Sequence, residues 1–257
     1  MNKKLIADRF AKAVPTYPHE ASIQHLIAIK MIRLLSHHLG MTNSSIIEFG
    51  CGTGNFSRLL FRTLHPTSLL LNDLCPEMQF ACRDLLQEEE VSFRAGDAET
   101  ELFDHQTGTD SSALYNLITS CSTLQWFESP TRFFQQCHMH LEDKGYFAFS
   151  TFGKENMQEI CHLTGNGLPY LSRQELENAL SPHFDIVHSE EETIPMHFDS
   201  PMNVLYHLRK TGVTGLSSHK WTRKNLVHFC QRYKSEFAHG HAVSLTYHPI
   251  YMIAQKK

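Results

Sequence analysis

The chain has 257 residues, which is enough for one domain of about 200 residues plus an elaboration. Its 41% hydrophobic and 11% aromatic residues can fill a buried core, whereas 19% charged residues are too few for a disordered chain or a long coiled coil. The net charge of −4 excludes a protein that binds polyanions over its whole surface.

Apolar runs alternate with amphipathic segments in the first part of the chain. An amphipathic helix is predicted over residues 20–39, within an N-terminal helical segment of about residues 1–40. Beyond it, the pattern predicts strands over 46–49, 68–71, 91–95, 113–119 and 145–152, and helices over 56–64, 76–87 and 130–141. Because these strands are apolar on both faces, we expect an α/β fold with a parallel sheet covered by helices.

The regular alternation of predicted strands and helices ends after residue 152. Helices are predicted near 154–164, 172–180, 201–211 and 222–237, a strand over 184–187, and a late strand from residues 244–247 and 250–254. We interpret about residues 200–240 as a helical cap inserted before the last strand, and residues 1–257 as a single domain.

A glycine-rich segment, Glu48–Gly54, follows the first predicted strand and precedes a helix. Glycine lets the backbone turn sharply, and a ligand can approach the main chain because no Cβ stands in the way. Asp73 ends the second strand, where a carboxylate meets ribose hydroxyls in dinucleotide folds, and Asp97 follows the third strand. The pattern favours a nucleotide-type ligand over a tight strand–helix turn without one.

Two common phosphate-binding loops do not fit this segment. A dinucleotide loop would need its last glycine at position 55, which is Asn55, and a P-loop would need a lysine that is absent here. The segment instead resembles the first motif of class I S-adenosylmethionine-dependent methyltransferases. That resemblance implies a Rossmann-like fold with a mostly parallel, seven-stranded sheet and helices on both faces.

The same resemblance implies how the cofactor lies. By this resemblance, the glycine loop would lie under the methionine portion of S-adenosylmethionine, Asp73 would bind the ribose hydroxyls, and Asp97 would contact the adenine amine. The implied cofactor-binding residues are Glu48, Gly50, Cys51, Gly52, Gly54, Asp73, Leu74, Asp97, Ala98 and Ser120. The loop 120–127 borders both the sulfonium and the acceptor, although Trp126 could equally be a core residue.

Positive charge is concentrated in the predicted cap. Between Pro201 and Lys234 there is no Asp or Glu, and this segment holds seven Lys and Arg residues. Such asymmetry within one chain indicates an acidic partner for the cap, the alternative being solvated helix faces.

Several further segments carry a resemblance to one family. They are Ile6–Phe10 and Tyr17, then 48–54, 95–99, 124–126 and 144–145, and, more particularly, 208–214 and 245–248. Nearly end to end, the chain resembles the malonyl-acyl-carrier-protein O-methyltransferases of biotin synthesis. It departs from them in having Glu48 where many members have Asp, in Cys51 and Thr53 at variable loop positions, and in a poorly matched stretch over 154–200.

Methyl transfer from S-adenosylmethionine to the free carboxylate of a malonyl thioester on acyl carrier protein is what this resemblance implies. The carboxylate is ionised at neutral pH, so no general base is expected. The implied substrate-positioning residues are Tyr17, Gln125, Trp126, Arg209 and Lys210, and the implied carrier-protein contacts are Arg209, Lys210, Lys220, Arg223 and Lys224. Arg209 could hold the carboxylate bidentately or could lie on the surface against the carrier protein.

Two other functions stay open at this stage: a methyltransferase acting on another small acid or on RNA, and an S-adenosylmethionine-binding module without catalysis. The histidines around Cys137–His140 and at His239 and His241 have no recognised zinc spacing, so no metal is expected. No signal peptide or membrane span is apparent, and seven cysteines without a CxxC pair indicate a cytoplasmic protein.

Overall fold

The computed structural model describes residues 3–14, 21–40, 44–101, 103, 114–212 and 222–257. Its main element is a seven-stranded sheet of order β3-β2-β1-β4-β5-β10-β6. The strands are β1 (Ser45–Phe49), β2 (Ser68–Asp73), β3 (Val91–Ala95), β4 (Tyr115–Cys121), β5 (Leu141–Phe152), β6 (Phe184–Glu191) and β10 (Pro249–Lys256). Strands β1 to β5 pair in parallel, and β10 is antiparallel to β5 and β6. The predicted sheet is confirmed.

Helices cover both faces of this sheet because its central strands are apolar on both sides. Ile46 of β1 packs in one core with α3 (Ser22–Leu39) and α4 (Asn55–Leu64). The next residue, Ile47, packs in the opposite core with α7 (Pro130–Met139) and α9 (Arg173–Leu180). Successive strand side chains point to opposite faces, so an uninterrupted apolar run needs a helix layer on each.

The predicted helix over 76–87 is wrong as a single element. The structure has α5 (Met78–Ala81) and a 3₁₀ turn, η1 (Leu85–Gln87). Arg58 donates from Nη2 to the carbonyl oxygen of Ala81 at 2.8 Å and pairs with Asp84 at 2.6 Å. Because a continuing helix would use that carbonyl for the N–H of Leu85, the guanidinium replaces a helical hydrogen bond and the helix ends.

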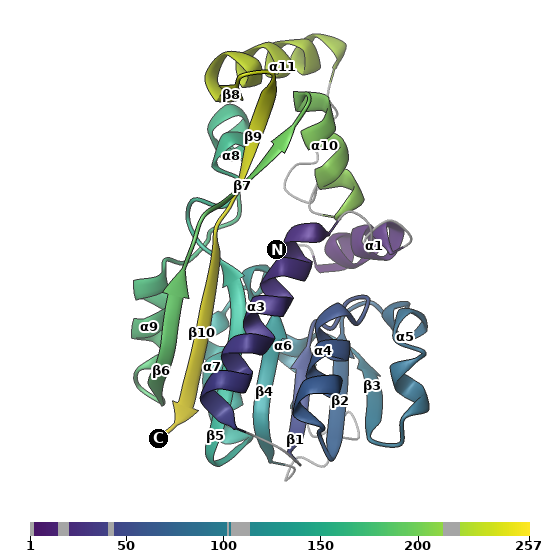
Figure 1. Ribbon diagram of the computed structural model, residues 1–257, viewed down its shortest axis with the longest axis vertical. Helices are drawn as coiled ribbons and strands as arrows, with labels where there is room; N and C mark the ends of the chain where they lie inside the picture. The colour runs from purple at the N-terminus through teal and green to yellow at the C-terminus, as the bar shows by residue number, and fades with distance from the viewer. Residues whose placement is uncertain (1–2, 15–20, 41–43, 102, 104–113, 213–221) are drawn as a thin grey trace.

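A second layer stands at the carboxyl-terminal ends of β1 to β5. It contains α8 (Gln158–Thr164), α10 (Pro201–Lys210), α11 (Arg223–Phe237) and a three-stranded sheet of β7 (Ile194–Phe198), β9 (Ala242–Tyr247) and β8 (Ala238–His239). We call this group the cap. Figure 1 shows the cap above the main sheet, with α1 (Lys3–Ala13) beside the junction. The helices predicted near 201–211 and 222–237 are present, whereas the cap's own sheet was not predicted.

The predicted late strand is also two strands, in different sheets. β9 pairs with β7 and β8 in the cap, and β10 pairs with β5 and β6 in the main sheet. The chain changes sheet at His248, which lies between them. This residue therefore joins the cap to the main sheet.

Within the described ranges, no helix is both long enough and apolar enough to cross a lipid bilayer.

Candidate functional site

The glycine-rich loop connects β1 to α4 through three residues with positive φ. Gly50, Gly52 and Gly54 have φ values of 68°, 53° and 79°. A Cβ on Gly50 would lie 2.2 Å from Oγ1 of Thr123, so a side chain there would collide with the loop that follows β4. The loop is held to the next strand by a hydrogen bond of 2.9 Å from the Cys51 N–H to the carbonyl of Asn72. The main chain is thus exposed to a cavity at the end of the strands.

Asp73, the last residue of β2, closes one side of this cavity. Its Oδ2 accepts a hydrogen bond of 2.8 Å from the N–H of Gly52, and its Oδ1 accepts one of 2.9 Å from the N–H of Cys75. Burial raises the pKa of Asp73, and these backbone donors oppose the shift. Each carboxylate oxygen keeps a lone pair beyond its backbone bond, so the group can accept hydrogen bonds from a ligand.

Glu48 is a buried carboxylate beneath the glycine loop. Its side chain lines the cavity, and its Oε2 is buried without a hydrogen-bond partner. Burial raises the pKa of Glu48 to about 8. Without a ligand the side chain therefore keeps a proton at neutral pH, and a cationic group in the cavity would favour its ionised form.

The helix α1 covers the cavity from the side opposite the sheet. Lys3 lies 2.7 Å from Asp97 Oδ2 and also pairs with Glu99, both beyond the end of β3. Cys75 donates from Sγ to the carbonyl of Ala7 at 3.3 Å, and the ring of Phe10 packs edge-on against Trp126 with 5.6 Å between centroids. A ligand in this cavity would be enclosed between the strand ends and α1.

Most of the predicted cofactor-binding residues meet in this one cavity, which we call the first pocket. It is lined by Glu48, Gly50, Cys51, Gly52, Asp73, Leu74, Asp97 and Ala98 from that set. Two predicted residues lie elsewhere. Gly54 is the N-cap of α4, and Ser120 is fully buried with its hydroxyl donating to the carbonyl of Phe49 at 2.7 Å. Ser120 therefore ties β4 to β1.

A second pocket adjoins the first, and the two share Phe10, Gln24, Ser122 and Trp126. The other residues that line it are Gln125, Phe152, Asn156, Met157, Leu168, Tyr170, Thr211 and Tyr247. Gln125 donates from Nε2 to the carbonyl of Ser122 and accepts from Thr151, which fixes its amide. The predicted positioning residues Gln125 and Trp126 thus lie where the main sheet and the cap meet.

Arg209 and Lys210 lie at the carboxyl-terminal end of α10 and are exposed. Neither residue lines the first or the second pocket. The structure therefore does not bring Arg209 together with Gln125 and Trp126. Tyr17 and Lys220 lie outside the described residues, and the predicted contacts Arg223 and Lys224 are exposed in the first turn of α11.

Sequence reasoning missed most of the second pocket. Thr211 and Tyr247 fell within the segments that carried the family resemblance, so those segments were a usable signal. Gln24, Asn156 and Tyr170 come from α3 and from the stretch between β5 and α9, and no local pattern marks them. Among the described residues, no group of three or more His, Cys, Asp or Glu side chains could hold a metal ion.

Comparisons with known proteins fit this geometry. Residues 19–192 match a family model described as a methyltransferase domain. The malonyl-[acyl-carrier protein] O-methyltransferase of Bacteroides thetaiotaomicron is 59% identical over 267 residues, covering 100% of this chain and 99% of the relative. A protein of the same name from Bacteroides helcogenes is 48% identical over 281 residues, covering 100% of both chains. The chain belongs to the malonyl-[acyl-carrier protein] O-methyltransferase family.

A solved structure shares the fold of this family member. A crystal structure from Bacillus halodurans, described as a candidate methyltransferase, superposes with a TM-score of 0.66 and covers 88% of this chain and 98% of that chain. The sequence identity is 13%, so this likeness shows the class I methyltransferase fold alone. The family resemblance inferred from the motifs is confirmed by the full-length relatives.

Proposed function

We propose that this protein transfers a methyl group from S-adenosylmethionine to the free carboxylate of a malonyl thioester on acyl carrier protein, at an early step of biotin synthesis. The observation that carries the proposal is the 59% identity, over the full length of both chains, to a malonyl-[acyl-carrier protein] O-methyltransferase. The two adjoining pockets support the proposal, because the first could hold S-adenosylmethionine and the second the acceptor.

The first pocket suits S-adenosylmethionine in its charge and shape. The ribose hydroxyls would donate to Asp73, whose oxygens retain lone pairs after their bonds to Gly52 and Cys75. The ammonium of the methionine part would satisfy the unpartnered Oε2 of Glu48. The methionine part would lie against the bare backbone of Gly50, where a Cβ has no room.

S-adenosylmethionine supplies a methyl group on a positively charged sulfur, and the acceptor carboxylate forms the new C–O bond as the C–S bond breaks. The opposite charges of the two reactants are lost in this step, so an enclosed site that excludes water favours it. No proton has to be removed from the acceptor. The residues around the second pocket therefore have to align the carboxylate at attacking distance, which is the main contribution expected of them.

The cap has a basic surface that suits an acidic carrier protein. On α10, the exposed Tyr206 shares a helix face with Arg209 and Lys210. On α11, the exposed Val227 shares a face with Arg223 and Lys224. Because Arg209 is exposed and lines neither pocket, we propose that it contacts the carrier protein and not the acceptor carboxylate. Such charges mainly govern the rate of encounter.

The test is incubation with methyl-labelled S-adenosylmethionine and three separate acceptors: malonyl-acyl carrier protein, malonyl-coenzyme A and a tRNA pool. We expect label in a base-labile ester of the malonyl thioester, with carrier protein preferred. Label in tRNA alone would contradict the proposal, and so would cofactor binding without transfer to any acceptor. Since every cysteine of the chain is a free thiol, we keep a cytoplasmic location as part of this proposal.

A further inference from the structure

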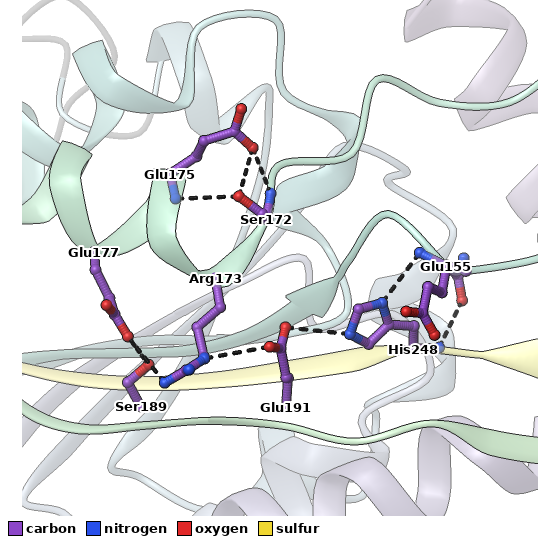
Figure 2. Close-up of polar contacts among 9 residues, drawn as sticks. Glu155, Ser172, Arg173, Glu175, Glu177, Ser189, Glu191 and His248 are labelled. Carbon is purple, nitrogen blue, oxygen red and sulfur yellow. Dashed lines mark hydrogen bonds and ion pairs between the residues drawn. The ribbon is translucent and has the colours of Figure 1, made fainter.

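His248, at the junction of the cap and the main sheet, has a fixed orientation. Its Nδ1 accepts a hydrogen bond of 3.1 Å from the N–H of Glu155, so the ring proton is on Nε2, which faces Glu191 at 3.2 Å. Figure 2 shows the imidazole between these two groups and Arg173 on the far side of Glu191, at 3.4 Å from it. The backbone of residue 248 is therefore held from several directions.

The backbone N–H of His248 in turn determines how Asn156 is oriented. It donates to Oδ1 of Asn156 at 3.3 Å, so the other end of this buried amide must be the NH₂ group. That Nδ2 donates to the hydroxyl oxygen of Tyr170 at 2.9 Å. The direction of the second hydrogen bond follows from the first, because an amide cannot accept through its nitrogen.

Tyr170 is left with a hydroxyl proton to donate. Among the residues that the structure describes, Asn156 is the hydrogen-bond partner of this hydroxyl, and Asn156 already acts as its donor. Burial raises the pKa of Tyr170 to about 12, so the proton stays in place at neutral pH. Tyr170 lines the second pocket, and that pocket is the space into which an acceptor oxygen can enter.

The second pocket contains polar groups with unused capacity but no lysine or arginine within the described part of the chain. The hydroxyl oxygen of Ser122 and Oε1 of Gln24 are both buried there without a hydrogen-bond partner, and both residues also line the first pocket. Buried polar atoms without partners are rare in folded proteins, so these atoms point to a polar ligand. A carboxylate between the two pockets could accept a hydrogen bond from the Ser122 hydroxyl and would face the positive sulfur of the cofactor, whereas Oε1 of Gln24 only accepts and suits an N–H or O–H of a ligand.

We propose that the Tyr170 hydroxyl, oriented by Asn156 and the backbone N–H of His248, is the donor that holds the malonyl carboxylate in the second pocket, which adjoins the first. This inference rests on the proposed function. A neutral donor suits the reaction because it orients the carboxylate without neutralising its charge, which the oxygen needs to attack a cationic methyl group. An arginine at this position would stabilise the carboxylate more strongly than the transition state, in which that charge is lost.

The first test replaces the hydroxyl alone. Tyr170→Phe is expected to lower kcat/KM for malonyl-acyl carrier protein at least tenfold, while the dissociation constant of S-adenosylmethionine stays within twofold of the wild type. The methyl ester product lacks the anionic oxygen. In Tyr170→Phe its inhibition constant should therefore rise much less than the dissociation constant of the malonyl acid. Tyr115→Phe, at the opposite end of β4, is the matched control and should behave as the wild type.

The second test reverses the hydrogen bond between residue 156 and the Tyr170 hydroxyl. In Asn156→Asp the carboxylate accepts from both neighbours, so the Tyr170 proton turns away from the pocket and the loss should match that of Tyr170→Phe. The double variant should lose no more than either single one, as expected for groups that act as a unit.

Wild-type kcat/KM in Tyr170→Phe would overturn the inference, as would equal weakening for the acid and the ester. A wild-type enzyme that methylates no malonyl acceptor would instead overturn the proposed function itself.

Discussion

At the scale of single residues, the first pocket is built from carboxylates that the fold has removed from water. Asp73 is 8% exposed and Glu48 is 1% exposed, yet only Asp73 is hydrogen-bonded by backbone donors through both of its oxygens. Glu48 keeps one oxygen without a partner. We therefore expect different ligand atoms at the two groups, hydroxyl donors beside Asp73 and a cationic group beside Glu48.

Replacing Asp73 tests the assignment of the ribose. Asp73→Ala should weaken the binding of S-adenosylmethionine about 100-fold, since two hydrogen bonds to a charged acceptor together contribute about 3 kcal/mol. Isothermal titration calorimetry measures this directly. Asp185→Ala, at the exposed start of β6, is the control and should leave the affinity unchanged. An unchanged affinity in Asp73→Ala, with a melting temperature close to that of the wild type, would contradict the ribose role.

Glu48 should make the stability of the ligand-free protein depend on pH. Its pKa is raised from 4.5 to about 8, so the folded state keeps a proton that the unfolded chain releases above pH 4.5. Stability contributed by this proton is therefore complete below pH 4.5 and is lost as the pH rises towards 8. At pH 7 the loss is about 3 kcal/mol, at about 1.4 kcal/mol per pKa unit.

Glu48→Gln removes that ionisation while preserving the shape of the side chain. Thermal unfolding without cofactor should show the variant more stable than the wild type at pH 8, with the difference vanishing near pH 4.5. A difference that is constant across this range would mean that Glu48 is ionised in the folded protein.

At the scale of elements, the sequence predicted what local patterns encode. The strands β1 to β5 were predicted correctly because each contains apolar residues shortly before a glycine or a polar residue, and parallel strand ends meet at one edge of the sheet. The cap sheet was not predicted because neither β7 nor β8 has a clear hydrophobic pattern. The residues of β7 alternate between partly buried and exposed, with none fully buried, and β8 is only two residues long. The pairing of β7 with β9 is a long-range contact that no window of sequence contains, whereas β8 pairs with β9 through a short turn at Gly240 and His241.

The same distinction applies to the two pockets. The first pocket is formed mostly by strand ends and loops with recognisable motifs, so most of the residues predicted to bind the cofactor do line this one cavity. The second pocket gathers side chains from α1, α3, the loop after β4, and both sides of the cap junction. Its composition follows from tertiary packing, and Tyr170 has no signal in its local sequence.

The helix α1 lies against the first pocket, and we expect it to limit entry and release of the cofactor. Its ion pairs through Lys3 to Asp97 and Glu99 hold it over the first pocket. Lys3→Ala should therefore raise the dissociation rate of S-adenosylhomocysteine about fivefold, as expected for loss of about 1 kcal/mol from partly exposed ion pairs. Stopped-flow fluorescence of Trp126 can measure this rate because α1 packs against that ring.

Lys4→Ala is the matched control, since Lys4 lies on the exposed side of the same helix. Equal dissociation rates in Lys3→Ala and Lys4→Ala would show that α1 does not limit release.

At the scale of the whole molecule, the two pockets adjoin where the main sheet and the cap meet. The main sheet and α1 enclose the first pocket, and the cap supplies Thr211 and Tyr247 to the second. The helices α10 and α11, which carry the exposed basic residues, belong to the cap, which lies above the main sheet in Figure 1. A carrier protein bound there would deliver its acyl group from the cap side while the cofactor is covered by α1.

This arrangement predicts that charge on the cap affects how fast the carrier protein binds and leaves the rate of methyl transfer itself unchanged. Arg223→Glu should lower kcat/KM for malonyl-acyl carrier protein about fivefold at low salt, and the difference from the wild type should shrink as salt screens the encounter. Arg223 is the first residue of α11, where a negative charge is favourable to the helix, so the fold should tolerate the change. Malonyl-coenzyme A should be used as well as by the wild type. Arg62→Glu, in the last turn of α4 shortly before the start of β2, reverses the same charge at the end of the sheet away from the cap and should leave both acceptors unaffected. If both variants slow the carrier-protein reaction equally, the effect comes from net charge and the cap is not the docking surface.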